Sequence, residues 1–528
     1  MRWRRTTSSS KGRATAAATD ARGALHAARP PARPPLTVLL ETVPPLQAGC
    51  TIAEIWDPVP DLRAAAILGR ALRALPYTEE SVEELLGEDG PAAGPADVQV
   101  FHRRLPDSPL ANAMRLLLLQ LPISRDAALE AFYEDGLEAL LAIGLARTAG
   151  DAIAPRGRIV PAEGLLLSFD GFTQGEDDPP GWVASYTPTA SWLAALTSRR
   201  RVRRALDIGT GSGAQALIAT RHADEVIATD VNQRALHFTA ISAAMNGIEN
   251  LEVRLGSLFE PVAGETFDLI TCNAPYVVSP EDRWQYRDAA GFEADQLSQT
   301  LVRQVPDHLA PDGYASMLVS WLAESKDDPD ERIDEWLEDN GCDAWVLALS
   351  GSDPLDHAAG WNEHLAENPE EYGAALDKWT EYFDALGVGW ITEGAVLLHK
   401  RAGDVHMIRT DSADEDELEF AGDQIERVFA ALELVAGIDD PQELLGERLA
   451  LAEETQIEYT ADADGARVVL EEGTWPSLDV EDETADVLGE LDGRASLVEA
   501  LDRARVPRRR STLEEIQELL ELGMLELR

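Results

Sequence analysis

The stretch Ala205-Leu-Asp-Ile-Gly-Thr-Gly-Ser-Gly213 decides the fold of the middle of this chain. A short apolar run that contains Asp207 leads directly into three alternating glycines, and an amphipathic helix pattern follows. Glycine lets the backbone turn tightly where a strand ends, and it lets a ligand approach the next helix without a Cβ in the way. The spacing Gly-x-Gly-x-Gly differs from the dinucleotide pattern Gly-x-Gly-x-x-Gly. The stretch therefore predicts a strand, a ligand-binding turn and a helix.

Similar β-branched runs alternate with amphipathic helix patterns on both sides of this loop. This alternation is typical of an α/β protein with a doubly wound parallel sheet. One helix pattern, at residues 233–245, ends at Asn246 and Gly247, which form a good C-cap. Seven strands are expected, at residues 205–208, 225–229, 251–254, 267–271, 314–320, 344–349 and 394–399. The sequence thus predicts one α/β domain over residues 181–401.

Two polar features lie at the expected ends of neighbouring strands. Asp230 closes the second strand, where a carboxylate can accept both hydroxyls of a ribose. An acidic residue at this point can equally cap the helix that starts near Asn232. The fourth strand runs into Asn273-Ala274-Pro275-Tyr276. A glycine loop, an acidic strand end and this tetrapeptide form a more specific combination than any one of them alone.

The combination resembles class I S-adenosylmethionine-dependent methyltransferases, in the amino-methyltransferase branch with an Asn-Pro-Pro-Tyr-type motif. That branch contains release-factor glutamine and RNA N-methyltransferases and the "methyltransferase small" domain. The resemblance covers residues 181–401 and implies a Rossmann-like, seven-stranded sheet with S-adenosylmethionine as the cofactor. It also implies a cradle for the methionine part of that cofactor, made by Gly209, Gly211 and Gly213.

The resemblance assigns further cofactor contacts by position. Asp207 would lie beside the amino group of the methionine part, and Asp230 would hold the ribose. Val231 and Leu258 would flank the adenine, next to Ser257, which stands where the family often has an aspartate. The segment Tyr186-Thr187-Pro188-Thr189 resembles the one that helps cover the cofactor, which adds Thr187 and Thr189 to the expected contacts.

The tetrapeptide carries the expected catalytic residues Asn273, Ala274, Pro275 and Tyr276. Methylation of a planar nitrogen requires its lone pair to leave conjugation and point at the methyl group. The side-chain oxygen of Asn273 and the backbone carbonyl of residue 274 can accept the two N–H bonds, while Tyr276 packs on the planar group. Ala274 stands where the family usually has its first proline; alanine keeps that carbonyl, and Pro275 biases it toward an extended backbone.

Composition limits the other possibilities. The 528 residues carry 45 Lys and Arg against 95 Asp and Glu, a formal charge of −50 that repels phosphate backbones at long range. Acidity can also be a solubility device. Three scattered cysteines, Cys50, Cys272 and Cys342, favour a reducing cytoplasm over a disulfide framework. No apolar run reaches the roughly 18 residues of a membrane span, and the histidines show no metal-ligand spacing.

The remaining segments divide by composition. Residues 1–56 are expected to be a disordered basic tail and linker, and residues 57–171 a helical domain that ends in a hairpin, as in winged-helix modules. Aromatic residues crowd an insert at 350–393, which we interpret as a lid, although such an insert can also pack on itself. Residues 411–528 are expected to hold an acidic linker and a small α+β domain. Expected helices of the flanks are 62–75, 79–86, 96–105, 116–132, 136–145, 496–504 and 513–527.

These patterns predict a cytoplasmic, metal-independent N-methyltransferase whose favoured acceptor is a protein glutamine. An exocyclic amine of a nucleobase in ribosomal or transfer RNA is the alternative acceptor, because winged helices often bind nucleic acid. A catalytically degenerate scaffold that binds the cofactor is the third alternative, on the strength of Ser257 and Ala274. The sequence does not predict the oligomeric state.

Overall fold

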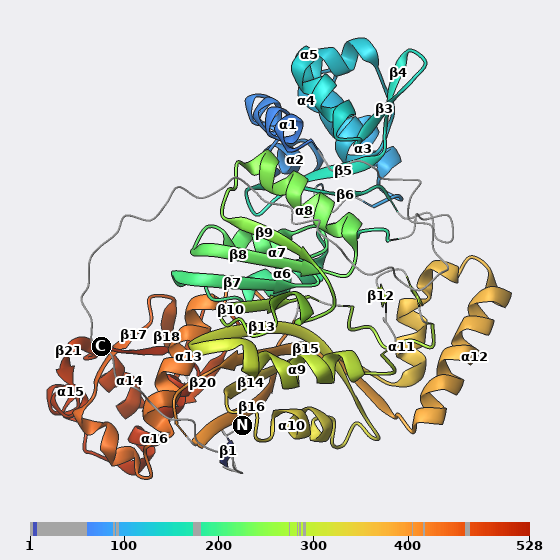
Figure 1. Ribbon diagram of the computed structural model, residues 1–528. Helices are drawn as coiled ribbons and strands as arrows, with labels where there is room; N and C mark the ends of the chain where they lie inside the picture. The colour runs from blue at the N-terminus through green and yellow to red at the C-terminus, as the bar shows by residue number, and fades with distance from the viewer. Residues whose placement is uncertain are drawn as a thin grey trace, which may run out of the picture.

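A nine-stranded sheet forms the centre of the molecule (Figure 1). The computed structural model describes residues 4–7, 61–87, 90, 94–172, 181–273, 275–281, 283–284, 287–288, 292–403, 405–414, 418–459 and 465–528. In spatial order the strands are β1 (Arg4–Thr7), β16 (Val405–Ser412), β14 (Asp343–Ser352), β15 (Trp390–His399), β13 (Leu309–Ala323), β10 (Phe267–Cys272), β7 (Val202–Ile208), β8 (Ala223–Asp230) and β9 (Leu251–Leu255).

The strand directions follow a mixed pattern. β9, β8, β7, β10 and β13 are parallel, whereas β15 runs antiparallel between β13 and β14. All seven expected strands are present, so the α/β prediction is confirmed. The expected number of strands in the sheet was too low, because β16 adds to β14 in parallel and β1 adds to β16 in antiparallel.

Both additional strands lie where the sequence suggested irregular chain. Asp411 was assigned to an acidic linker, but it belongs to β16, where it accepts a hydrogen bond from Trp345 Nε1 at 2.9 Å. The buried carboxylate of Asp343 accepts from the backbone N–H of Met407 at 2.8 Å and pairs with Arg401, which fixes β16 beside β14. Residues 4–7 form a strand instead of a disordered tail. The rest of the expected tail lies outside the described residues.

Alternate residues of each strand enter two different cores, as expected for a pleated sheet covered on both faces. Leu206, Ile270 and Val319 face one side, which is covered by α9 (Gln296–His308) and α10 (Glu331–Leu337). The other side is covered by α6 (Pro188–Ala195), α7 (Ala214–Ala219), α8 (Gln233–Asn246) and α13 (Gly422–Val435). Gly247 ends α8 in the left-handed conformation, so the expected C-cap is confirmed.

The N-terminal helical domain packs on α8 at one end of the sheet (Figure 1). Its helices are α1 (Leu62–Ala74), α2 (Glu79–Leu86), α3 (Val98–Arg104), α4 (Pro109–Ala113), the π-helical turn Met114–Leu118 and α5 (Arg125–Ala142). Arg73 Nη2 donates to the carbonyl of Met245 at 2.7 Å. Gly69 sits so close that a Cβ there would lie 2.0 Å from the same oxygen. The contact with α8 therefore requires glycine at this position.

A broken helix and a small antiparallel sheet follow within this domain. Tyr133, with φ 56° and ψ 179°, divides α5 into two helices joined by a tight turn. β2 (Ile123–Ser124), β4 (Ala152–Pro155) and β3 (Ala146–Ala149) form an antiparallel sheet in that order, and β3 and β4 form a hairpin. The gap expected between helices 116–132 and 136–145 agrees with the break at Tyr133. The first of these helices was wrong in its N-terminal half, because β2 interrupts it and α5 begins only at Arg125, and the second ends at Ala142. A second hairpin, β5 (Gly157–Ala162) and β6 (Leu165–Asp170), leads to the sheet.

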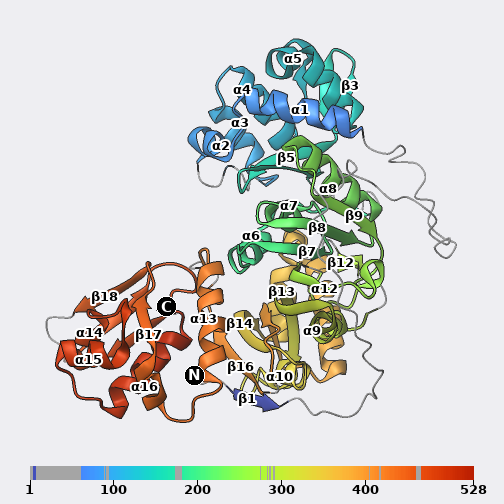
Figure 2. The same cartoon turned by 60° about the vertical axis from the view of Figure 1, so that its left-hand side comes forward.

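The C-terminal module lies at the opposite end, with α13 between it and the sheet (Figure 2). It contains two three-stranded sheets, β21-β17-β22 and β18-β19-β20, with α14 (Asp482–Leu488), α15 (Leu497–Ala504) and α16 (Arg510–Glu521). The expected last helix ends early, since Leu525–Leu527 form β22. The strand bounds are β17 Arg448–Leu451, β18 Thr455–Tyr459, β19 Ala466–Leu470, β20 Ser477–Val480 and β21 Asp492–Ser496.

Candidate active site

The glycine loop leaves β7 at the middle of the sheet. Gly209, Gly211 and Gly213 have φ angles of 66°, 55° and 87°, a region that other residues rarely adopt. At Gly213 space is limiting as well, because a Cβ would lie 2.8 Å from Thr239 Cγ2 and 2.9 Å from Leu217 Cδ1. The turn before α7 thus depends on glycine for both its backbone conformation and its packing.

Asp230, at the end of the neighbouring strand β8, holds this loop in place. It is 9% exposed; one carboxylate oxygen accepts from the N–H of Gly211 at 2.9 Å and the other from the N–H of Asn232 at 2.8 Å. The alternative helix-cap role falls to Asn232, whose Oδ1 accepts from Arg234 N at 3.0 Å.

Asp207 lies deeper, one turn below the loop. Its side chain is buried, and its two oxygens accept from the hydroxyls of Thr210 at 2.6 Å and Thr271 at 2.9 Å. Burial raises the pKa of this carboxyl to about 6, against the opposing effect of the two hydroxyl hydrogen bonds. In this structure Asp207 therefore braces the start of the loop against β10.

The segment expected to hold an adenine surrounds the outer end of β8. Val231 is 47% exposed, which is unusual for a valine beside a buried strand end. The N–H of Gly256 donates to the carbonyl of Asp230 at 3.0 Å and brings the turn with Ser257 and Leu258 next to it. Leu258 has a φ of 48° and packs partly against the core beneath. The exposed side chain of Val231 and the turn that contains Ser257 and Leu258 thus lie next to each other.

Thr187 and Thr189 lie at the start of α6. Thr187 Oγ1 accepts from Ala190 N at 3.4 Å as the helix N-cap, and the two hydroxyls lie 2.8 Å apart. Gln215 of α7 donates to the carbonyl of Ala190 at 2.6 Å, which ties α6 to the helix that follows the glycine loop. The threonine segment is therefore placed against the loop.

Asn273 comes directly after β10, whose last residue Cys272 pairs with Ile208 before Gly209. The carboxyl ends of these strands meet at the same edge, so the glycine loop and the tetrapeptide are neighbours. The half-buried side chain of Asn273 has no hydrogen-bond partner within the described residues. Ser320 Oγ of β13 donates to the carbonyl of Tyr276. Ala274 lies outside the described residues.

Sequence reasoning missed the residues that hold the chain beyond Tyr276. Val277 and Val278 are buried in a small core formed with the insert, and its helices α11 (Pro354–Trp361) and α12 (Pro369–Leu386) supply the other side. Trp379 and Phe383 are fully buried there. The excess of aromatic residues in the insert was the available signal, but nothing in it revealed which segment those residues would cover.

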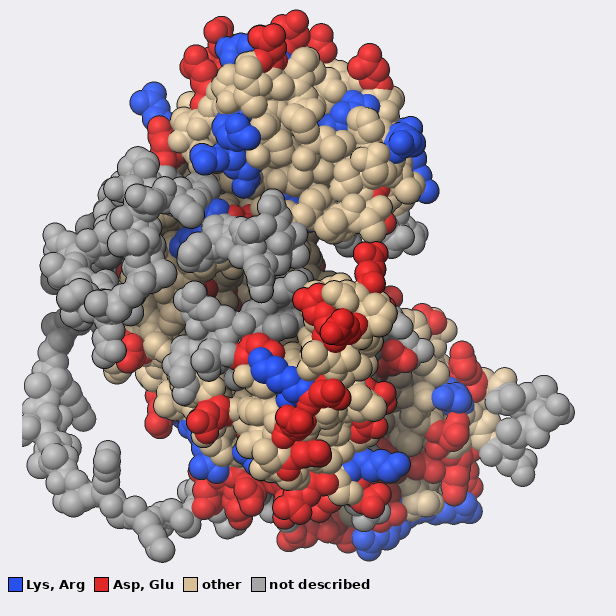
Figure 3. All heavy atoms as spheres, turned by 90° about the vertical axis from the view of Figure 1, so that its right-hand side faces the viewer, with Lys and Arg blue, Asp and Glu red and all other residues tan. Residues whose placement is uncertain are grey.

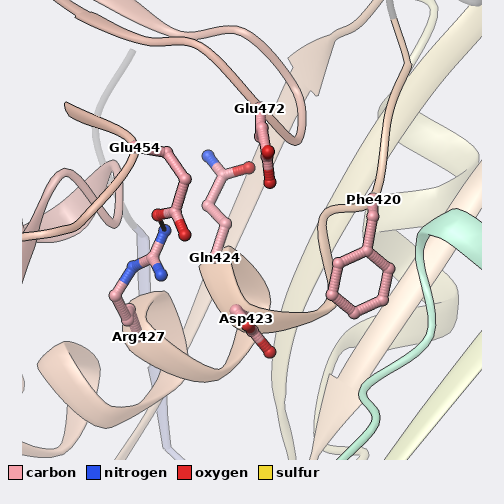
Figure 4. Close-up of a pocket in the computed structure, with 6 residues that line it drawn as sticks. All are labelled: Phe420, Asp423, Gln424, Arg427, Glu454 and Glu472. Atoms are coloured by element: carbon pink, nitrogen blue, oxygen red, sulfur yellow. Dashed lines mark ion pairs between the residues drawn. The ribbon is translucent and has the colours of Figure 1, made fainter. Parts of the chain in front are cut away.

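A small hollow between α13 and the C-terminal module is lined by Phe420, Asp423, Gln424, Arg427, Glu454 and Glu472 (Figure 4). In that hollow the charge of Arg427 is matched by Glu454 at 3.4 Å. Within the described residues, no group of three or more His, Cys, Asp or Glu side chains is placed to hold a metal ion. None of the described helices is long and apolar enough to cross a membrane.

Comparison with known families assigns the region of the glycine loop and the tetrapeptide. Residues 188–321 match the methyltransferase small domain, which confirms the resemblance and identifies a class I S-adenosylmethionine-dependent methyltransferase domain. Residues 74–156, which run from the end of α1 through β4, match a domain of unknown function, DUF7059.

Curated relatives match a part of this chain. The ribosomal protein uL3 glutamine methyltransferase of Bradyrhizobium diazoefficiens is 30% identical over 168 residues, which are 29% of this chain and 52% of the relative. A release factor glutamine methyltransferase of Xylella fastidiosa is 32% identical over 130 residues, 22% of this chain and 47% of the relative. This chain thus spans about half the length of these relatives. The crystal structure of ribosomal protein L11 methylase from Lactobacillus delbrueckii subsp. bulgaricus is 20% identical, covering 32% of this chain and 74% of that one, with a TM-score of 0.23.

Proposed function

We propose that this chain, through its class I methyltransferase domain, transfers a methyl group from S-adenosylmethionine to the side-chain amide nitrogen of a protein glutamine. The observation that carries the proposal is Asn273: a half-buried amide with no partner in the described chain, beside the glycine loop. A buried polar group pairs with a partner, and a half-buried amide that has none within the described chain is open to one from outside it. An acceptor amide is a suitable partner.

The residues of the loop fit the cofactor. Asp230, which fixes Gly211, would accept from ribose hydroxyls, and the exposed face of Val231 offers apolar surface to an adenine ring. Gly209, Gly211 and Gly213 would border the methionine part, with Asp207 below its amino group. Ser257, Leu258, Thr187 and Thr189 would complete the enclosure. When bound, S-adenosylmethionine supplies an electrophilic methyl group on its sulfonium.

The chain's own part in the reaction is to orient the acceptor. We assign Asn273 Oδ1 and the carbonyl of residue 274 as acceptors of the two amide N–H bonds, so that the nitrogen lone pair turns out of conjugation toward the methyl group. Pro275 restricts the backbone of that carbonyl, and Tyr276 would pack on the planar amide. Such positioning by fixed hydrogen-bonding groups is a large part of catalysis in sites of this kind.

The surface supports a protein acceptor over RNA. The second half of α5, which corresponds to the nucleic-acid recognition helix of a winged helix, exposes Glu134, Asp135 and Glu138. Carboxylates at these positions would repel phosphates. Figure 3 shows acidic side chains gathered over the lower part of the face where the insert lies. The two curated relatives named above are glutamine methyltransferases, which agrees with this choice.

Transfer of label from tritiated S-adenosylmethionine into fractionated lysate tests the proposal. We expect label in a protein band that is sensitive to protease and resistant to nuclease, and release of N5-methylglutamine on full proteolysis. Nuclease-sensitive label would establish the RNA alternative. Absence of transfer together with tight cofactor binding would establish the scaffold alternative. The cytoplasmic location stays a prediction.

A further inference from the structure

His357 of helix α11 contacts the chain that leaves the tetrapeptide. Its Nε2 lies 3.1 Å from the carbonyl oxygen of Val278, a residue 79 positions earlier in the sequence. Both residues are buried: Val278 is 0% exposed and His357 is 4% exposed. Since a carbonyl can only accept, Nε2 is the donor.

The surroundings of His357 fix its ring in one orientation. The ring packs against Trp361, Trp379 and Phe383, with ring centroids 6.4, 5.8 and 5.5 Å away. Burial lowers the pKa of the imidazole to about 4, so at neutral pH it is uncharged and has one N–H. That N–H donates to the carbonyl of Val278. Nδ1 therefore carries no hydrogen, and its lone pair lies 3.8 Å from Glu393 Oε1. Trp361 Nε1 donates to this same carboxylate oxygen at 3.1 Å.

Two hydrogen bonds from different elements thus hold alternate carbonyls of one short segment. Ser320 of β13 donates to Tyr276, and His357 of the insert donates to Val278. A third tie, from Lys378 Nζ of α12 to Glu281 Oε1 at 2.8 Å, fixes the far end of the segment. The segment between residues 275 and 281 is therefore clamped from the sheet on one side and from the insert on the other.

We propose that His357 is a positioning residue for the methyl acceptor: it acts through the carbonyl of Val278 to hold the backbone that presents Asn273 and Tyr276. The proposal rests on the proposed function and extends it, because it makes the insert a fixed support of the acceptor side. It replaces our interpretation of the insert as a lid, since a lid would have to release the packed contacts of Trp379 and Phe383 with each turnover.

Three variants separate the hydrogen bond from the packing. His357→Phe keeps an aromatic ring but removes the donor, whereas His357→Gln keeps a neutral N–H donor at a similar reach and removes the ring. His364→Phe changes an exposed histidine in the same insert and serves as the control. For each variant we would measure amide hydrogen exchange in the peptide 275–281, affinity for S-adenosylhomocysteine by calorimetry, and kcat and KM for the labelled acceptor.

We expect His357→Phe to speed exchange in residues 275–281 about tenfold and to lower kcat about tenfold, the typical effect of leaving a buried carbonyl without its donor. Its affinity for S-adenosylhomocysteine should match wild type. In His357→Gln, both the exchange rate of residues 275–281 and kcat should be close to the wild-type values. Wild-type exchange and kcat in His357→Phe, or equal losses in the phenylalanine and glutamine variants, would overturn the proposal. The exchange measurement needs no acceptor. It therefore tests whether His357 holds residues 275–281 even if the wild-type protein transfers no methyl group and the proposed function fails.

Discussion

The cofactor side and the acceptor side of the site are built in different ways. On the cofactor side, two of the three hydrogen bonds that hold the loop are local: Thr210 donates to Asp207 across 3 positions and Gly211 donates to Asp230 across 19, while Thr271 of β10 donates to Asp207 across 64. On the acceptor side, the backbone after Asn273 is held by Ser320 and His357, which lie 44 and 79 positions from the residues they hold.

This difference matters for how each half tolerates change. A loop closed by near neighbours is determined by its own short stretch of sequence, so one expects the same geometry wherever that stretch occurs. A backbone held by distant elements depends on the insert and on the far strands being in place. We therefore expect the geometry of the cofactor half to recur wherever this stretch of sequence occurs, and the geometry of the acceptor half to be specific to this chain.

Asn273→Ala is expected to affect the acceptor side most strongly and to leave cofactor binding unchanged. Removal of one preorganised hydrogen-bonding group in such a site typically lowers turnover about 10²–10³-fold. Binding of S-adenosylhomocysteine should stay at the wild-type value, because the amide is assigned to the acceptor. Single-turnover kinetics with the labelled acceptor and calorimetry measure the two quantities. Full transfer by this variant would remove Asn273 from the mechanism.

Gly213→Ala changes the cofactor half, and we expect it to lower the free energy of unfolding. The left-handed backbone costs an alanine about 1–2 kcal/mol, and the close approach to Thr239 and Leu217 adds a similar amount of overpacking, for a loss of about 3 kcal/mol in unfolding free energy. Gly247→Ala is the matched control: its φ is 70°, but nothing lies within 4 Å of a Cβ there. Equal losses in urea unfolding would show that packing at Gly213 contributes nothing.

Asp207 gives the cofactor half a pH dependence. Its carboxyl ionises near pH 4 in the unfolded chain but at a pKa of about 6 in the folded one, so its contribution to stability is fully present below pH 4 and is lost as the pH rises through 6. The full loss from this group is at most about 3 kcal/mol. Asp207→Asn keeps an acceptor for Thr210 and should lose this contribution to the pH dependence. Parallel curves of unfolding free energy between pH 4 and 7.5 for both proteins would contradict the raised pKa.

The smallest effect is expected from Asp230→Ala, about 1.5–3 kcal/mol in affinity for S-adenosylhomocysteine, the range for hydrogen bonds to a charged group. Asp224, near the opposite end of the same strand, is the control position, and its change to alanine should leave affinity unaltered. Calorimetry distinguishes the two. Similar affinities for the Asp230 and Asp224 variants would show that the ribose is not held at Asp230.

Much of the fold followed from local patterns. The strands of the central domain, helix α8 with its Gly247 cap and the glycine loop were all predicted at nearly their observed positions, because period and capping are properties of short segments. The edge strand β16 was not predicted: its acidic residues, such as Asp411, indicated a linker until Trp345 and Arg409 were found to pair with them. The break of α5 at Tyr133 falls in the gap expected between helices 116–132 and 136–145, whereas the short strand β2 within the first of these was not predicted.

By itself the sequence determined the methyltransferase domain and the positions of Asp230 and Asn273, because a strand end, a turn glycine and a tetrapeptide are encoded within a few residues each. Only the tertiary structure decided that the aromatic insert covers Val278 and that His357 donates to its carbonyl. Such contacts join residues far apart in the chain, and they exist only once the folded core has brought those residues together.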